Sequence, residues 1–215
     1  MARMTAVFGG AFDPPTLAHE AIVRTMAETD VDEVMVVPCL GHPFGKDMAP
    51  FHDRVAMCES AFGGIKKASV SAIAEEVTSD KTIDLLEFLA GRKRIPIPVI
   101  GLDEACQICK WHRWQDLLRL YRFVVVERLT ATRGARELEL FYWRTQHVYL
   151  SPDPPIPPTS STDARRNIGY LGDAAMSGRW GGIDEMYAAE LSGLMSRPPF
   201  DVAVARGLYG CQRPR

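Results

Sequence analysis

The stretch FGGAFDPPTLAHE, residues 8–20, marks the junction of a strand and a helix. The apolar run over residues 4–9 predicts a buried strand, and apolar residues at helical spacing over 17–29 predict a helix. Gly9 and Gly10 let the backbone turn and approach a ligand with no Cβ in the way. The free N–H groups and the positive dipole end of the following helix would face this corner, which suits a phosphate.

Strand and helix signals alternate along the rest of the chain. Further strands are predicted over 33–38, 68–77, 97–101, 121–128 and 146–150, and further helices over 51–62, 82–91 and 104–119. Strands separated by helices of this length form right-handed βαβ units and a parallel sheet. We therefore expect an α/β fold, a Rossmann-like parallel sheet flanked by helices. Ligands bind such sheets beyond the carboxyl ends of the strands, where residues 8–20 and VIGLDE (99–104) lie.

The last quarter of the chain predicts a small helical part, residues 159–215, within a single domain of residues 1–215. It follows the proline-rich stretch SPDPPIPPTSST (151–162), which can be neither a helix nor a central strand. One helix would begin at the end of this stretch, and a second is predicted near 183–195. Residues 130–145 stay open as a helix, an edge strand or a subunit contact.

Composition excludes several classes of partner. The 215 residues carry a net charge of −2, so no overall field favours nucleic acid or an anionic membrane. No apolar run is long enough to span a bilayer, and the N-terminal residues lack the features of a signal peptide. Five irregularly spaced cysteines indicate free thiols in a reducing compartment. We expect a cytoplasmic protein that binds neither nucleic acid nor membranes.

Two helix beginnings carry the candidate phosphate donors. Thr16 and His19 lie three residues apart and so share a helix face. Near the C-terminal third, Arg165 lies one turn into a helix that SSTDARR, residues 160–166, would cap. Taken singly, each has a plain alternative: a capped helix with an incidental histidine, and an ordinary cap with an exposed arginine.

Together these two motifs resemble the HxGH-type nucleotidyltransferases, and most closely the nicotinate or nicotinamide mononucleotide adenylyltransferases. The family's first motif, GGxFDPxHxGH, is matched at Gly9, Gly10, Phe12, Asp13, Pro14 and His19. Thr16 stands where the first histidine is usual, and Ala18 stands where glycine is usual, so its methyl group could crowd the adenine or ribose. The family's ISSTxIR appears as TSSTDAR, with matches at Ser160, Ser161, Thr162 and Arg165.

Weaker matches follow in the family's order, so the resemblance extends from residue 5 to about residue 190. GKDMAPFHDRVAMC (45–58) supplies Lys46, Arg54 and Met57. TIDLL (82–86) supplies Thr82 and Asp84, with Leu85 in place of a second threonine. GLDEACQICKWHRWQDLL (101–118) supplies Gly101, Asp103, Trp111 and Trp114.

The resemblance implies an in-line transfer in which a mononucleotide 5′-phosphate attacks the α-phosphorus of ATP and pyrophosphate leaves with Mg²⁺. It implies catalytic roles for His19, Thr16, Lys46 and Arg165. It implies ATP contacts at Gly9, Gly10, Phe12, Asp13, His19, Gly101, Asp103, Ser160, Ser161, Thr162 and Arg165. It implies contacts with a pyridine mononucleotide at Lys46, Thr82, Asp84 and Trp111. We expect no metal ligand from the protein itself, and the oligomeric state stays open, with a homo-oligomer as one option.

Several alternatives stay open or are set aside. The acceptor could instead be phosphopantetheine or a polyol phosphate, and Thr16 and Ala18 would also fit a nucleotide-binding module that has lost catalysis. Nicotinate is favoured over nicotinamide, and Trp111 could be a core residue. GHPFGKD (41–47) lacks the spacing of a P-loop. Two sets of residues are expected to pack or to lie at the surface without chemistry: the lone pair Cys106 and Cys109, expected to be buried on a helix, and the histidines His42, His52 and His147.

Overall fold

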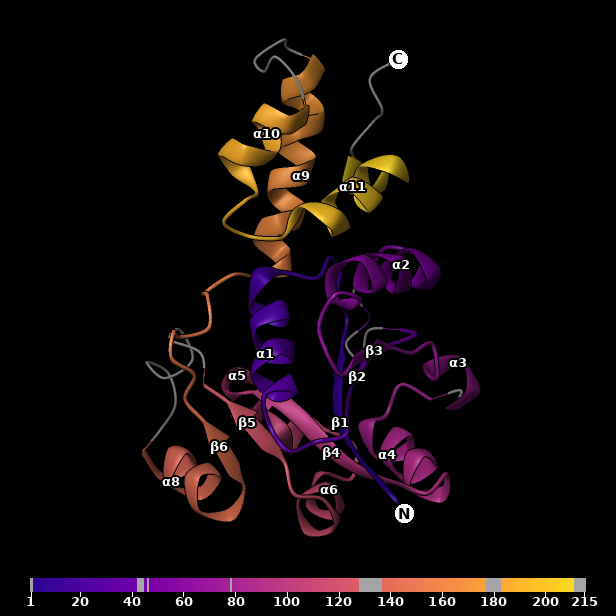
Figure 1. Ribbon diagram of the computed structural model, residues 1–215, viewed down its shortest axis with the longest axis vertical. Coiled ribbons are helices and arrows are strands. Elements are labelled where there is room, and N and C mark those ends of the chain that lie inside the picture. Colours follow the sequence, from indigo (N-terminus) through magenta and orange to yellow (C-terminus); the bar gives the residue numbers. More distant parts are fainter. Residues whose placement is uncertain are drawn as a thin grey trace.

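The computed structural model describes residues 2–41, 45, 47–77, 79–127, 137–176 and 183–210. Its centre is a six-stranded sheet in which every neighbouring pair is parallel, in the order β3-β2-β1-β4-β5-β6 (Figure 1). The strands are β1 (Arg3–Gly10), β2 (Glu33–Pro38), β3 (Ala68–Val70), β4 (Arg94–Gly101), β5 (Val124–Val126) and β6 (Val148–Leu150). The predicted α/β fold with a Rossmann-like parallel sheet is confirmed.

Helices cover both faces of this sheet because its strands alternate apolar side chains between two cores. On β1, Ala6 and Phe8 enter a core shared with α1 (Leu17–Ala27) and α2 (Phe51–Phe62). Val7 points the other way, into a core shared with other helices. These are α3 (Ala74–Val77), α4 (Thr82–Gly91), α5 (Leu102–Ala105), α6 (Trp114–Leu120) and α8 (Glu137–Gln146). The chain reverses direction across the sheet between β1 and β4, where open parallel sheets bind ligands.

Several predicted elements are shorter in the structure, among them the strand expected over 121–128, observed as Val124–Val126, and the helix near 183–195, observed as Ile183–Glu190. Two others differ in kind over part of their length. The strand expected over 68–77 ends at Val70, and residues 74–77 form α3. This strand lies at the edge of the sheet and pairs only with β2, and a bond from the Ile73 N–H to Ser71 Oγ turns the chain away. The helix expected over 104–119 is broken into α5, a 3₁₀ turn over Ile108–Lys110 and α6. Arg113, which caps α6, adopts a left-handed conformation with φ 53° and so separates α6 from the 3₁₀ turn.

The cysteines and histidines outside the candidate site have packing or surface positions. Cys106 and Cys109 do not share a helix, and Cys109 is exposed, so the expectation that both are buried on one helix is wrong. His147 is buried against Trp143, and His52 is exposed beside Glu75. His42 lies outside the described residues.

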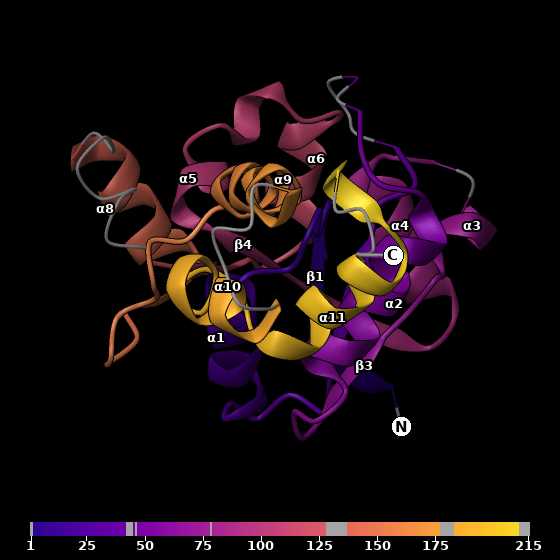
Figure 2. The same ribbon diagram turned by 90° about the horizontal axis from the view of Figure 1, so that it is seen from above.

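The C-terminal helices lie together at one end of the sheet (Figures 1 and 2). They are α9 (Ser161–Met176), α10 (Ile183–Glu190) and α11 (Arg197–Ala205), followed by a 3₁₀ turn over Leu208–Gly210. They share a small core that includes Ile168, Leu191 and Phe200. Residues 137–146, whose structure the sequence left open, form the helix α8. No helix among the described residues is long and apolar enough to cross a bilayer.

Arg54 fixes the loops at the carboxyl ends of β1 and β2. Its side chain is buried, and its guanidinium donates to the carbonyl oxygens of Ala11 at 2.8 Å, Cys39 at 2.8 Å, Leu40 at 3.1 Å and Ala49 at 2.9 Å. These four residues lie outside the helices and strands, so regular secondary structure supplies no donor for their carbonyl groups. The arginine therefore replaces missing backbone partners beside the candidate site.

We expect Arg54→Met to lower the free energy of unfolding by about 3 kcal/mol, because it leaves several buried carbonyl groups without a donor. Urea denaturation measures this loss. The control is Arg119→Met, which removes an exposed arginine paired with Asp116 and should change stability by less than about 1 kcal/mol. Equal effects of the two substitutions would show that the Arg54 contacts add little.

Candidate active site

The corner between β1 and α1 turns at Phe12, which has a φ of 47°, and not at the glycine pair, which closes β1 in extended pairing. The Phe12 ring is 1% exposed and packs edge-on against Phe8 and Phe62. A Cβ on Gly10 would lie 3.2 Å from this ring. Gly10 therefore makes room for Phe12, and the Phe12 side chain supports the corner from the core.

Thr16 and His19 form the cap of α1. The Thr16 N–H donates to His19 Nδ1 at 3.0 Å, and Thr16 Oγ1 lies 2.9 Å from the same nitrogen. The His19 ring also packs on Phe12, with ring centroids 5.1 Å apart. A nitrogen that accepts from a backbone N–H carries no proton, so the neutral imidazole holds its proton on Nε2. His19 is thus a fixed part of the cap, with a donor nitrogen opposite the one that Thr16 holds.

Ala18 does not crowd the corner. Its side chain is 1% exposed and belongs to the core under α1. Its N–H donates to Thr159 Oγ1 at 3.0 Å, across 141 residues of chain. The expectation that its methyl group would obstruct a nucleotide is therefore wrong for this backbone.

The beginnings of α1 and α9 meet at this corner. Arg165 Nη1 donates to the main-chain oxygen of Asp13 and lies 3.4 Å from Asp13 Oδ2. Ser161 Oγ donates to the carbonyl of Pro14 at 2.8 Å. Ser160 caps α9 by accepting from the Asp163 N–H at 3.1 Å. The first turns of two helices, far apart in sequence, are therefore joined at one corner, and Arg165 adds a positive charge there. The Leu17 and Ala18 N–H groups at the start of α1 donate to the Leu194 carbonyl and to Thr159 Oγ1, so the expectation that free N–H groups of this helix face the corner is wrong for these two.

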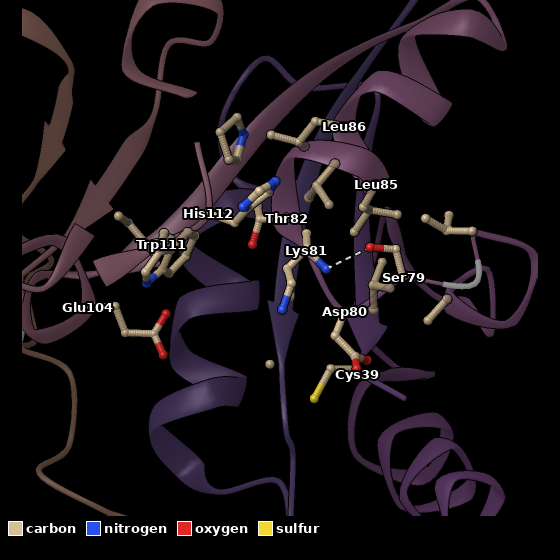
Figure 3. Close-up of a pocket in the computed structure, with 18 of the residues that line it drawn as sticks. Cys39, Ser79, Asp80, Lys81, Thr82, Leu85, Leu86, Glu104, Trp111 and His112 are labelled. Atoms are coloured by element: carbon tan, nitrogen blue, oxygen red, sulfur yellow. Dashed lines mark hydrogen bonds between the residues drawn. The ribbon is translucent and has the colours of Figure 1, made fainter. Parts of the chain in front are cut away.

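A pocket of about 490 Å³ opens beside the corner, beyond the carboxyl ends of β1 and β4 (Figure 3). Its lining includes Gly9, Gly10, Cys39, Ser79, Asp80, Lys81, Thr82, Glu104, Trp111 and His112. In Figure 3, Trp111 and Glu104 lie on one side, Ser79 and Asp80 on the other, and Lys81 and Thr82 between them. The glycine pair thus borders both the helix beginnings and the pocket.

The pocket brings together some of the predicted mononucleotide residues and not others. Thr82 and Trp111 line it, and Trp111 also packs on the second core. Asp84 does not line it and instead accepts from Ser79 Oγ at 2.5 Å, which orders the loop before α4. Gly101 is buried at the end of β4, and α5 begins at the next residue. Asp103 is exposed in the first turn of α5. Lys46 lies outside the described residues.

Sequence reasoning missed several residues of the pocket and the corner. Lys81 directly precedes the predicted Thr82, and this position next to a predicted pocket residue could have identified it. His112 directly follows the predicted Trp111, so it too had a usable signal in the sequence. Cys39 gave no signal, and burial raises the pKa of its thiol, which keeps it protonated. Tyr209 gave none either, since its bond to Asp13 joins residues 196 positions apart.

We expect His19 to carry its proton on Nε2 at a pH above about 8, where an ordinary imidazole is neutral. The ¹⁵N chemical shifts of the labelled ring should then be pyridine-like for Nδ1 and pyrrole-like for Nε2. His112, which is exposed, should show averaged shifts and serves as the control. A pyrrole-like Nδ1 in His19 would contradict the cap geometry.

Comparisons with known proteins agree on one family. The family model described as cytidylyltransferase-like matches residues 7–167. A probable nicotinate-nucleotide adenylyltransferase of Anaeromyxobacter dehalogenans is 33% identical over 174 residues, covering 77% of this chain and 84% of the relative. One from Sulfurimonas denitrificans is 32% identical over 169 residues, covering 76% and 84%.

The fold agrees as well. The structure of Plasmodium falciparum nicotinic acid mononucleotide adenylyltransferase complexed with NaAD superposes with a TM-score of 0.70 at 20% identity, covering 98% of each chain. With the helix beginnings joined at Asp13 and the pocket beside them, these matches show that the chain belongs to the cytidylyltransferase-like nucleotidyltransferases, in the family of the nicotinate-nucleotide adenylyltransferases.

Proposed function

We propose that the protein transfers the adenylyl group of ATP to nicotinate mononucleotide, giving nicotinate adenine dinucleotide and pyrophosphate. An oxygen of the mononucleotide 5′-phosphate forms a bond to the α-phosphorus, and the bond from that phosphorus to the oxygen bridging to the β-phosphate breaks. The observation that carries the proposal is the shared border at Gly9 and Gly10. It lets one nucleotide reach the helix beginnings while the other occupies the pocket, with their phosphates meeting at the glycine pair.

The chemistry needs alignment and charge neutralisation more than a nucleophile from the protein. His19 Nε2–H and the Arg165 guanidinium are donors fixed by the cap of α1 and by Asp13. Thr16 is buried against His19, so its part is to hold the imidazole. Lys46 stays a predicted donor to the same phosphates. Donors fixed in advance stabilise developing charge without reorganising during the step.

Mg²⁺ would neutralise charge on the triphosphate. Among the described residues, no three His, Cys, Asp or Glu side chains gather as metal ligands. This donor set fits an ion held mostly by phosphates and water, as Mg²⁺ commonly is. Asp103, exposed after β4, could accept from a metal-bound water or a ribose hydroxyl.

The pocket favours a pyridine acceptor bearing a carboxylate. Trp111 offers an indole face to a flat ring, and Thr82 offers a hydroxyl. Lys81 lines the same pocket, and no ion pair joins it to another described residue. Because Asp80 and Glu104 add negative charge nearby, a bound carboxylate needs such a cation. The named relatives, which are nicotinate-nucleotide enzymes, support the same choice. The four described cysteines are free, and we propose the cytoplasm as the compartment.

Turnover with ATP and a panel of acceptors tests this function through pyrophosphate release. We expect nicotinate mononucleotide to be the best acceptor, ahead of nicotinamide mononucleotide, phosphopantetheine and polyol phosphates. His19→Ala should lower kcat about a hundredfold or more with little change in ATP affinity, because its donor acts on charge that develops in the transition state. ATP binding without turnover on any acceptor would favour the non-catalytic module instead.

We expect Lys81→Gln to lower the preference for nicotinate over nicotinamide mononucleotide about tenfold, because the carboxylate loses a charged donor and the amide does not. The ratio of the two kcat/KM values measures it. The matched control is Lys66→Gln, an exposed lysine after α2 and away from the pocket lining. An unchanged ratio would assign acid recognition to other groups of the pocket.

A further inference from the structure

We infer that Tyr209, near the end of the described chain, is a positioning residue for Arg165. This inference rests on the proposed function for its kinetic consequence, and on the geometry at Asp13 for its physical basis. Tyr209 lies in the 3₁₀ turn after α11, outside the segments that carry the motifs of the family. Its role concerns how the arginine is held before ATP arrives.

Asp13 is the link between the two residues. Tyr209 Oη donates to Asp13 Oδ1 at 2.7 Å, and the Ala49 N–H donates to the same oxygen at 3.1 Å. The other oxygen, Oδ2, lies 3.4 Å from Arg165 Nη1. Asp13 is only 2% exposed, so protein groups and not water set the orientation of its carboxylate. With Oδ1 held by Tyr209, the carboxylate keeps Oδ2 toward the guanidinium.

The backbone around Tyr209 places its hydroxyl at Asp13. Tyr209 adopts a left-handed conformation with φ 57°, which residues other than glycine seldom adopt, between Gly207 at 65° and Gly210 at 80°. Its carbonyl oxygen lies against α9, 3.6 Å from where a Cβ on Gly169 would stand. An ion pair between Arg206 and Asp53 joins the same part of the chain to α2. Strained residues of this kind persist where the surroundings determine them and often mark functional sites.

The hydroxyl stays a donor. Burial raises the pKa of Tyr209, and its bond to Asp13 and the charge of Asp13 raise that pKa further, so the hydroxyl keeps its proton near neutral pH. Arg165 in turn keeps a third of its side chain exposed, which lets its guanidinium meet a phosphate while Asp13 holds one of its nitrogens. Removing the Tyr209 hydroxyl leaves Oδ1 with the Ala49 N–H as its remaining donor, so the carboxylate is held less firmly and orients the Arg165 guanidinium less firmly.

The first test compares Tyr209→Phe with Tyr187→Phe. Tyr187 is a matched control because it also lies in the C-terminal helical part and donates its hydroxyl, to the Met195 carbonyl at 2.9 Å, without reaching Asp13. We expect Tyr209→Phe to lower kcat about tenfold and to leave KM for the mononucleotide unchanged. Tyr187→Phe should leave kcat unchanged, and its largest expected effect is a lower melting temperature. Equal effects of the two substitutions on kcat would overturn the inference.

The second test is a double-mutant cycle on kcat and on ATP affinity. If Tyr209 acts through Asp13 on Arg165, Tyr209→Phe should change either quantity less than about twofold once Arg165→Lys is present. Independent effects that multiply in the double variant would overturn the link. ATP affinity, measured by calorimetry without an acceptor, needs no turnover. Failure of the proposed reaction in the wild-type protein is therefore distinguishable from failure of the Tyr209–Arg165 coupling.

Discussion

The buried carboxylate of Asp13 is the group on which the candidate site depends. It receives bonds from Tyr209 and from the loop before α2, and its residue binds Arg165 through both the side chain and the main chain. A buried charge is tolerated only where donors surround it. Four parts of the chain must therefore come together at this point, and the beginnings of α1 and α9 are held there as a result.

The parallel sheet explains why that point is useful. β1 ends at the glycine pair, and its neighbour β4 ends at Gly101, so both strands open onto the crevice where the chain changes direction in the sheet. The beginnings of α1 and α9 meet at this edge, and α4 and the segment after β4 line the pocket beside them. The proposed reaction between two phosphates requires both places side by side, and the fold forms them from segments that are far apart in sequence.

Relatives of this chain are named for nicotinate-nucleotide adenylyl transfer, and the details of the corner agree with a working site rather than a lost one. Thr16 replaces a histidine, yet it fixes the remaining His19 by its backbone N–H and its hydroxyl. Ala18 replaces a glycine, yet its methyl group packs in the core under α1. Both departures are thus accommodated at the corner, where the proposed donors His19 and Arg165 are held.

The sequence by itself determined the class of fold, the family and the two helix beginnings. Apolar periodicity and short motifs are local, so they can be read without knowing which residues pack against each other in the fold. It misplaced the end of β3, which is an edge strand, and it missed the break before α6, where Arg113 is left-handed. Only the tertiary structure decided that Phe12 belongs to the core, that Lys81 lines the pocket with Trp111, and that Tyr209 holds Asp13. Those contacts join residues tens to hundreds of positions apart, and a hydrogen bond or a packed ring depends on where the whole chain brings its groups together.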